Sequence, residues 1–273
     1  MKLTDLGAGT GCCAAAVLLL AGALGGAALA DEGACFKGAA EARAAQVADA
    51  RALTLDDGRV LRIAGIEPFD LLRPDLGDAE AALERRLSEL VNEATVSVQF
   101  ASEEVDRYGR RPALVAAAGV LLQESLAGEG LVVAFASGDP LPCFERILAA
   151  EEAARRAGRG FWRDAALPQA RPELLAARIG HFAIFEGEII SVGSRSTRTY
   201  LNFGRRWSQD VTVEIEARDR RRFGGEAGLA ALAGQRVRVR GFLEAKAGPM
   251  MAIRSPMQLE VLNVGAGGKG QAP

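Results

Sequence analysis

Polar and apolar residues alternate from Ala39 to about Gly65, and Asp57-Gly58 separates two apolar runs within this stretch. Alternation with period two is typical of strands, and Asp-Gly between such runs is a strong hairpin signal. Helical spacing follows in EAALERRLSELV after Asp78, then ATVSVQF and RPALVAA alternate as strands. Helices are also predicted from Val120 to Glu129 and over CFERILAAEEAARRAG, which begins after Pro142. These patterns predict a small barrel with three helices.

Strand patterns return after the proline-containing segment AALPQARPELL. The expected strands are FAIFEGEIISV, TYLNFG, VTVEIEA, QRVRVRGFL and MMAIRSPMQLEVL, and the helical segment EAGLAALAG lies between the third and the fourth. Three strands, a helix and two strands is the order of a five-stranded OB barrel. The fold class expected is therefore α+β, mainly β, with two successive barrels.

The N-terminal segment has the features of an export signal. Residues 11–30 carry no charge, and Ala28-Leu29-Ala30 places small residues before the acidic Asp31-Glu32. We expect a signal peptide over residues 1–30 and a periplasmic or secreted protein with no stable membrane span after cleavage. The alternative is an uncleaved anchor, because 20 uncharged residues can just span a bilayer.

Cleavage after Ala30 removes two of the four cysteines and leaves Cys35 and Cys143. An exported protein meets an oxidising compartment, and two cysteines allow one pairing. We predict a Cys35–Cys143 disulfide; the alternative is two unrelated buried thiols.

The domain boundaries follow from these patterns. We expect a first domain over residues 31–166, a linker or short docking helix over 167–177, and a second domain over 178–264. The glycine-rich tail over residues 265–273 has nothing to pack and is expected to be disordered.

Charge distinguishes the two halves. The 273 residues carry 33 Lys/Arg and 35 Asp/Glu, and a net charge of −2 excludes a uniformly cationic nucleic-acid packer. Residues 31–171 hold 17 basic and 24 acidic residues, whereas residues 172–262 hold 14 basic and 10 acidic. The second half is thus the better candidate for contact with a polyanion. The single histidine, His181, excludes chemistry that needs a pair of histidines.

Two runs in the first half carry a family resemblance: LRIAGIEPFD over residues 61–70 and DRYGRRPALV over residues 106–115. With the helices around them, they resemble the thermonuclease (staphylococcal-nuclease-like) family over about residues 39–163. The resemblance implies an OB-like barrel and a secreted, calcium-dependent phosphodiesterase or endonuclease. Its chemistry uses oxygen ligands for one calcium ion, a carboxylate that activates water and two arginines that hold the phosphate.

Carried over to this chain, the resemblance implies that Arg62 and Arg110 bind phosphate and that Asp70 acts as general base. Glu67 and Asp49 would be calcium ligands. Glu67 is one methylene longer, and Asp70 one methylene shorter, than the family's usual residues.

A more serious departure is Arg51, which stands where the family has a calcium carboxylate, and Ala52 replaces a threonine. The exchange of a carboxylate for a guanidinium changes the local charge by two units, so we expect calcium to bind poorly or not at all. If the site is active its cofactor is calcium; if it is not, no cofactor is needed. Arg62 and Arg110 could equally form an ion network with neighbouring carboxylates.

In the second half, aromatic and basic residues are interleaved within thirteen positions. Stacking platforms and a cationic groove are what single-stranded nucleic acid binding requires. The candidate contacts are Arg195, Arg198, Tyr200, Phe203, Arg205, Arg206 and Trp207. Alternatively, Phe203 and Trp207 fill the core and the arginines keep an edge strand soluble. QRVRVRG adds Arg236, Arg238 and Arg240 as a basic stripe on a half-exposed strand, which resembles OB-type nucleic-acid-binding domains.

The sequence therefore predicts an exported thermonuclease-like protein that binds DNA or RNA, with single strands favoured and phosphodiester hydrolysis impaired by Arg51. The alternative is a non-catalytic binding or cell-envelope protein on a nuclease scaffold.

Overall fold

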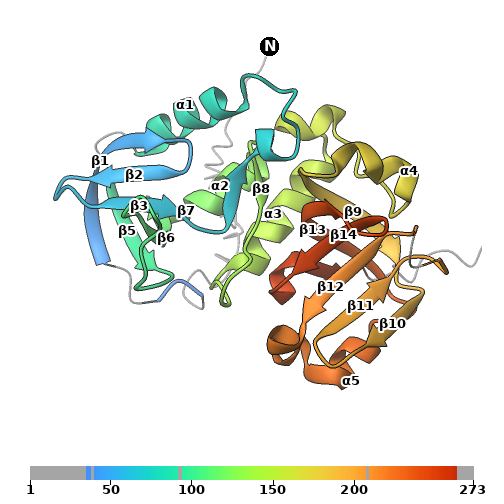
Figure 1. Ribbon diagram of the computed structural model, residues 1–273. Coiled ribbons are helices and arrows are strands. Elements are labelled where there is room, and N and C mark those ends of the chain that lie inside the picture. Colours follow the sequence, from blue (N-terminus) through green and yellow to red (C-terminus); the bar gives the residue numbers. More distant parts are fainter. Residues whose placement is uncertain (1–34, 38–39, 92–93, 207–208, 263–273) are drawn as a thin grey trace, which may run out of the picture. The chain divides into compact units, whose positions relative to one another are not determined.

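The computed structural model describes residues 35–37, 40–91, 94–206 and 209–262. The expected signal peptide over residues 1–30 and the expected tail over residues 265–273 lie outside the described residues. Within the part described, the fold is mixed and mainly β, as the patterns predicted (Figure 1).

The N-terminal half is built on a curled sheet. Its strands run in the order β3-β2-β1-β5-β6-β7, and β3 also pairs with β6 in parallel, so the pairing returns to its start and the sheet is OB-like. The Asp57-Gly58 hairpin joins β2 to β3, and Gly58 has a φ of +84°, a left-handed conformation that suits glycine. The strands are β1 (Ala40–Asp49), β2 (Ala52–Leu55), β3 (Val60–Ile63), β5 (Thr95–Phe100), β6 (Arg111–Ala117) and β7 (Val120–Leu121).

The three helices predicted for this half are present. They are α1 (Ala79–Val91), α2 (Leu122–Glu129) and α3 (Phe144–Arg156). Leu83 and Leu87 of α1 are fully buried against the sheet, as their helical spacing requires. A short two-stranded sheet joins β4 (Ile66–Pro68) to β8 (Val132–Ala134).

The C-terminal half contains a second sheet. Its order is β10-β11-β12-β14-β13-β15, and β9 pairs with β13. In sequence, β9 is followed directly by β10. The elements are β9 (Phe182–Glu188), β10 (Ser191–Ser194), β11 (Arg198–Asn202), β12 (Thr212–Glu216), α5 (Gly225–Ala230), β13 (Arg236–Ala245), β14 (Pro249–Ile253) and β15 (Leu259–Val261).

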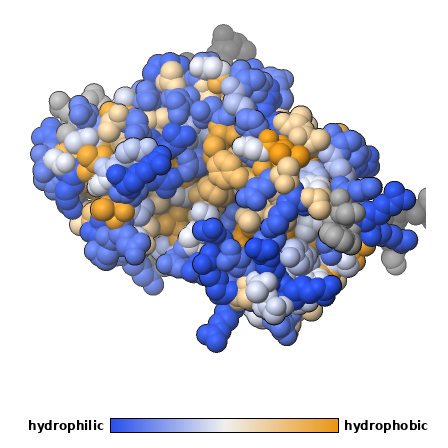
Figure 2. All heavy atoms as spheres, in the orientation of Figure 1, coloured by the Kyte–Doolittle hydropathy of each residue, from blue (hydrophilic) through white to orange (hydrophobic). Residues whose placement is uncertain are grey.

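Three hydrophobic clusters support these sheets. Two lie within the N-terminal and C-terminal sheets, and the third combines residues of both halves. Phe69 and Trp162 from the first half meet edge to face at 4.7 Å between ring centroids, and Phe182 and Ile184 of β9 are buried in the same cluster. The two sheets therefore share part of their core, and the described residues from Cys35 onward form one compact unit. Figure 2 shows one face of the molecule, where hydrophilic residues predominate and hydrophobic ones form smaller patches.

The segment between the halves is docked on the second sheet. Pro172 begins the short helix α4 (Pro172–Leu175), and Leu175 is fully buried in the C-terminal cluster. The backbone N–H of Ala170 donates to the carbonyl of Glu186 at 2.7 Å. The sequence was compatible with either a linker or a short docking helix over residues 167–177. The contacts of Ala170 and Leu175 are those of a docked segment.

The expectation of a basic stripe on β13 was wrong for Arg238 and Arg240, although Arg236 is exposed. Arg238 and Arg240 are 3% and 0% exposed, as well buried as the valines between them. Glutamates of α3, β9 and β15 surround their guanidinium groups, which therefore lie against the first half instead of facing solvent. Period two predicts that alternate residues share a face, but it does not show what covers that face.

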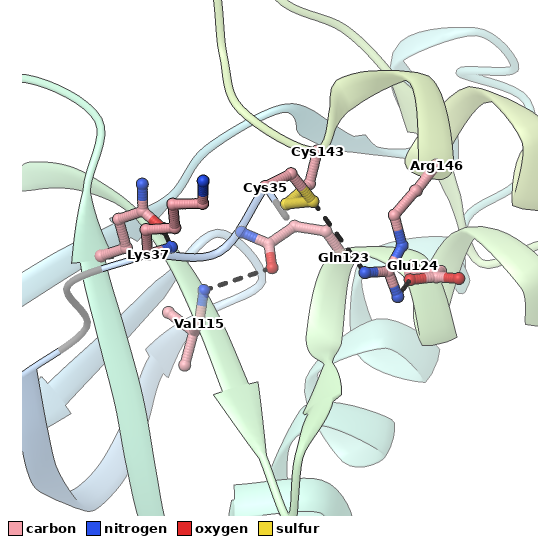
Figure 3. The surroundings of a disulfide bond; sticks show 8 residues. Cys35, Lys37, Val115, Gln123, Glu124, Cys143 and Arg146 are labelled. Atoms are coloured by element: carbon pink, nitrogen blue, oxygen red, sulfur yellow. Dashed lines mark hydrogen bonds and ion pairs between the residues drawn. A yellow bond between two sulfur atoms is a disulfide. The ribbon is translucent and has the colours of Figure 1, made fainter. Parts of the chain in front are cut away.

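The predicted disulfide is confirmed, because Cys35 and Cys143 are bonded across 108 positions of sequence. Figure 3 shows the guanidinium of Arg146 next to this bond, and Arg146 Nη2 also donates to Glu124 Oε2 at 2.5 Å. The disulfide thus fastens the start of the described chain to the first residues of α3. Within the described residues, no helix has both the length and the apolar character needed to cross a membrane.

Candidate functional site

The acidic turn of the thermonuclease-like motif is held by β4 and the 3-10 turn over Phe69–Leu71. Glu67 lies in β4, whose pairing with β8 fixes it, and Arg62 lies in β3. Gly65 connects β3 to β4 with a φ of +84°, and Leu141 approaches so closely that a side chain there would collide with it. A glycine at this position therefore lets the acidic turn fold against the start of α3.

Arg51 is ion-paired with the residue expected to bind calcium. Its Nε donates to Glu67 Oε2 at 2.8 Å, and its Nη1 donates to Glu80 Oε1 of α1 at 3.1 Å. The other oxygen of Glu67, Oε1, accepts a hydrogen bond from Arg62. Both oxygens of this carboxylate are thus bonded to guanidinium groups.

The charge of Arg51 is stabilised in this position. Burial by itself lowers the pKa of Arg51, but the hydrogen bond and charge of Glu67, with the charges of Glu80 and Asp70, outweigh burial and raise the pKa above its ordinary value. Arg51 is therefore a permanent cation among three carboxylates.

The DRYGR loop orders the second predicted phosphate ligand. Asp106 Oδ1 accepts from the backbone N–H of Tyr108 and of Arg110, and Asp106 Oδ2 accepts from Arg110 Nε at 2.8 Å. Burial raises the pKa of Asp106, but these hydrogen bonds lower it to a net value below the ordinary one. Arg110 Nη1 also reaches Asp49 Oδ2 at 3.0 Å. Tyr108 is 65% exposed beneath the guanidinium groups of Arg107 and Arg110.

The structure brings four of the predicted residues, Asp49, Arg62, Glu67 and Arg110, into one network of ion pairs and hydrogen bonds. Asp49 links its two parts, because Asp49 Oδ1 accepts from the backbone N–H of Arg51 at 2.6 Å while Oδ2 pairs with Arg110. Asp70 lies close enough for its charge to act on Arg51, and Asp70 Oδ1 is buried with no hydrogen-bond partner in the described structure. Sequence reasoning missed Glu80, since nothing in its spacing from Arg51 indicates that the first turn of α1 lies over the site.

Calcium does not fit this arrangement. A calcium site needs several oxygen ligands around one point. Among the described residues no group of three or more His, Cys, Asp or Glu side chains is placed to hold a metal ion. The carboxylates of Glu67 and Glu80 converge on the Arg51 guanidinium instead.

Beside this network lies a cleft of about 330 Å³. Arg62 and Glu67 form one side, Ser102 and Glu104 of the β5–β6 loop another, and the loop from Phe135 to Leu141 the third. Arg222, which follows β12, donates to the carbonyl of Gly138 at 2.9 Å and pairs with Asp139 at 2.7 Å. The C-terminal half thus supports one wall of the cleft.

The second candidate site is the outer face of the C-terminal sheet. Thr199 and Leu201 of β11 are fully buried, whereas Arg198, Tyr200 and Asn202 are partly exposed on the opposite face. Arg195, Arg205 and Arg206 are exposed in the loops before and after β11. This strand therefore presents a basic and aromatic face to solvent.

Phe203 lies differently from the other candidate contacts. It packs edge to face on Phe185 at 5.4 Å between ring centroids, against the hydrophobic core. Phe203 thus takes the core position that the sequence analysis gave as the alternative to contact with nucleic acid. Trp207 lies outside the described residues.

Comparison with known protein families gives a match within the N-terminal half. A family described as Staphylococcal nuclease homologue matches residues 79–164, from α1 to the 3-10 turn that contains Trp162. This range includes Arg110, but Arg51, Arg62, Glu67 and Asp70 precede it. No curated protein matches the chain. The match supports a thermonuclease-like domain in the N-terminal half.

Proposed function

We propose that this protein binds single-stranded nucleic acid, and that its thermonuclease-like site has lost calcium-dependent hydrolysis. The observation that carries the second part is the Arg51 guanidinium bonded to Glu67 and Glu80. A divalent cation at this position would have to displace it.

Charge explains why displacement is unfavourable. At about 4 Å and an effective dielectric constant near 20, repulsion between a guanidinium and a divalent ion is several kcal/mol. Arg51 also belongs to a chain of ion pairs that continues through Glu67 to Arg62. A cation that took this place would leave the partly buried Arg51 guanidinium without Glu67 and Glu80, which adds to the cost.

The binding function rests on both halves. We propose that the C-terminal sheet is an OB-type barrel over residues 178–264, because β12 pairs with β14 in parallel and the remaining pairs are antiparallel. Nucleic acid would lie on the face that carries Arg198 and Tyr200, with Arg195, Arg205 and Arg206 near the phosphates. Stacking on an aromatic ring contributes about 1–3 kcal/mol per base. The domains would extend over residues 31–166 and 178–264, joined by residues 167–177.

Hydrolysis is the second candidate function, and one observation favours it. Asp70, the predicted general base, retains a buried oxygen with no partner among the described residues. Arg62 and Arg110 would then hold the phosphate, once substrate displaced their carboxylate partners. A non-catalytic cell-envelope role is the remaining alternative.

We further propose that the protein is exported to an oxidising compartment. The confirmed Cys35–Cys143 disulfide and the uncharged segment over residues 11–30 support this localisation.

The test uses the full mature chain, because its two sheets share a cluster. Fluorescence anisotropy with labelled DNA and RNA single strands of about 20 nucleotides should show binding that weakens steeply with salt. The same strands, incubated with millimolar CaCl₂, should remain intact. Absent or salt-insensitive binding would contradict the binding function. Calcium-dependent cleavage that Asp70→Asn abolishes would show instead that the enzyme is active.

A further inference from the structure

The outer face of the C-terminal sheet contains a cavity of about 410 Å³. Strand register places its lining in two rows. Gly193, Tyr200 and Glu214 are neighbours across β10, β11 and β12, and Asn202, Thr212 and Met250 are neighbours across β11, β12 and β14. Lys246, in the turn between β13 and β14, lies at the rim. The volume of the cavity is that of a small-ligand pocket.

One side of the cavity suits a flat aromatic ring. Tyr200 offers its ring, and its cross-strand neighbour Gly193 has no side chain; a Cβ there would meet nothing within 4 Å. The space beside Tyr200 is therefore open. A planar base could occupy it in contact with Tyr200 and with the peptide backbone of Gly193.

The cavity floor carries a nearly buried carboxylate. Glu214 is 5% exposed, Arg198 Nε lies 3.0 Å from its Oε1, and Lys246 Nζ lies 3.3 Å from its Oε2. An ionised carboxylate has about four acceptor positions, so two cationic partners leave capacity for further N–H donors. The hydroxyl of Thr212, in the adjacent row, has no hydrogen-bond partner in the described structure.

The order of hydrogen-bond donors and acceptors in the cavity, one donor followed by two acceptors, distinguishes between the bases. Lys246 donates, and the two oxygens of Glu214 accept. Guanine presents the complement along its Watson–Crick edge: the O6 acceptor, then the N1–H and N2–H donors. Thymine and uracil place acceptors on both sides of a single N–H, and adenine and cytosine place a ring-nitrogen acceptor beside their amino group. Thymine and uracil would therefore point an acceptor at Glu214. Adenine and cytosine, with the ring nitrogen on Lys246, would offer Glu214 one N–H from this edge where guanine offers two.

We infer that this cavity holds one guanine base of a bound single strand, stacked on Tyr200 and recognised by Glu214 and Lys246, with Arg195 near its phosphate. This inference rests on the proposed function and adds base preference to it. Asn202, Thr212, Glu214, Lys246 and Met250 thereby join the binding face.

The experiment measures the affinity of the full chain for labelled oligothymidylates of about 12 nucleotides. Three central positions are thymine in one strand and guanine, adenine or cytosine in the others. The guanine strand should bind about tenfold more tightly than the others, as expected for one bidentate contact. In Glu214→Gln, whose amide presents one donor and one acceptor, that ratio should fall towards one while binding of the thymidine strand persists.

The matched control is Glu216→Gln, two residues further along β12 and paired with Arg218. It should keep the guanine preference. If Glu214→Gln fails to fold by thermal melting, Lys246→Met in the exposed turn should reduce the preference instead, because it removes the donor to O6. Binding without base preference, or an unchanged preference in the variants, would overturn the guanine site. No binding of any strand would instead overturn the proposed function.

Discussion

Arg240 of β13 and Glu151 of α3 form a fully buried ion pair between the two halves of the protein, with 3.0 Å between Nη2 and Oε1. Arg240 Nη1 donates to the carbonyl of Ala134 at 2.6 Å, and Glu151 Oε2 accepts from the N–H of the same residue at 2.5 Å. Glu260 of β15 also pairs with Arg240. The end of β8, which leads into the wall of the cleft, is thus held by a side chain from each half.

Removal of the Arg240 charge should destabilise the whole chain. In Arg240→Met, Glu151 and Glu260 lose their buried cation, and the loss of one partner of a buried pair costs about 3–5 kcal/mol. Urea unfolding should show this decrease in a single transition, because the halves share the cluster around Phe182. Arg236→Met is the matched control on the same strand: its side chain is 44% exposed, so the change should be small. An equal loss in both variants would contradict a special role for the buried pair.

The disulfide should contribute strongly to stability. Its loop of 108 positions corresponds to about 4–5 kcal/mol in the chain-entropy model. The double variant Cys35→Ser, Cys143→Ser should therefore unfold at lower urea concentration. Intact-mass analysis of alkylated, unreduced wild-type protein should find neither cysteine modified. Two alkylated thiols in that sample would refute the bond.

Calcium should have no effect on the melting temperature of the wild-type protein. A ligand that binds only the folded state must stabilise that state. Because the Arg51 guanidinium repels calcium, we expect no binding and therefore no stabilisation. Arg51→Asp restores a carboxylate beside Glu67 and Glu80, so millimolar calcium should raise the melting temperature of this variant. Arg59→Asp, on the exposed β2–β3 hairpin, makes the same charge change away from the site and should show no calcium response. A calcium-dependent shift in the wild type would show that Arg51 does not exclude the ion.

Acid should weaken the ion network around Arg238. Burial raises the pKa of Glu186, but hydrogen bonds from Arg238 and Arg236 outweigh burial and hold this pKa below its ordinary value. Arg155 and Arg238 likewise hold the pKa of Glu152 below its ordinary value, against the effect of burial. A carboxylate whose folded pKa is depressed stabilises the protein above its unfolded pKa and loses this effect as pH falls through the folded value. The free energy of unfolding should therefore decrease below about pH 4.5.

In Glu186→Gln, the wild-type dependence on pH in this range should be reduced, because one of these carboxylates no longer titrates. Glu173→Gln, on the exposed surface of α4, should keep the wild-type dependence. Urea titrations at several pH values measure both. The same acid dependence in wild type and Glu186→Gln would exclude Glu186 as a contributor.

Most of the strands, the three N-terminal helices and the pairing of the two cysteines were predictable from the sequence. The short strands β4 and β8 were not predicted, and the expected strands FAIFEGEIISV and MMAIRSPMQLEVL are each divided into two strands. Hydrophobic periodicity reports which residues share a face, and residues such as Leu83 and Leu87 lie within one helix, so the information is local. The motifs with Arg62 and Arg110 indicated the thermonuclease-like domain for the same reason: each is a short continuous run. Arg51 could be recognised as out of place by comparison with the family pattern.

Only the tertiary structure determined which groups the charged side chains contact. Arg238 and Arg240 have the spacing of a solvent-facing stripe, but α3, more than eighty positions earlier, covers them with glutamates. Glu80 meets Arg51 because α1 packs over the site, and Glu214 lines a cavity because strand register places it beside residues of other strands. The local sequence pattern around a charged residue is the same whether its side chain faces water or a carboxylate. Which of the two it meets depends on packing between segments that are distant in the sequence.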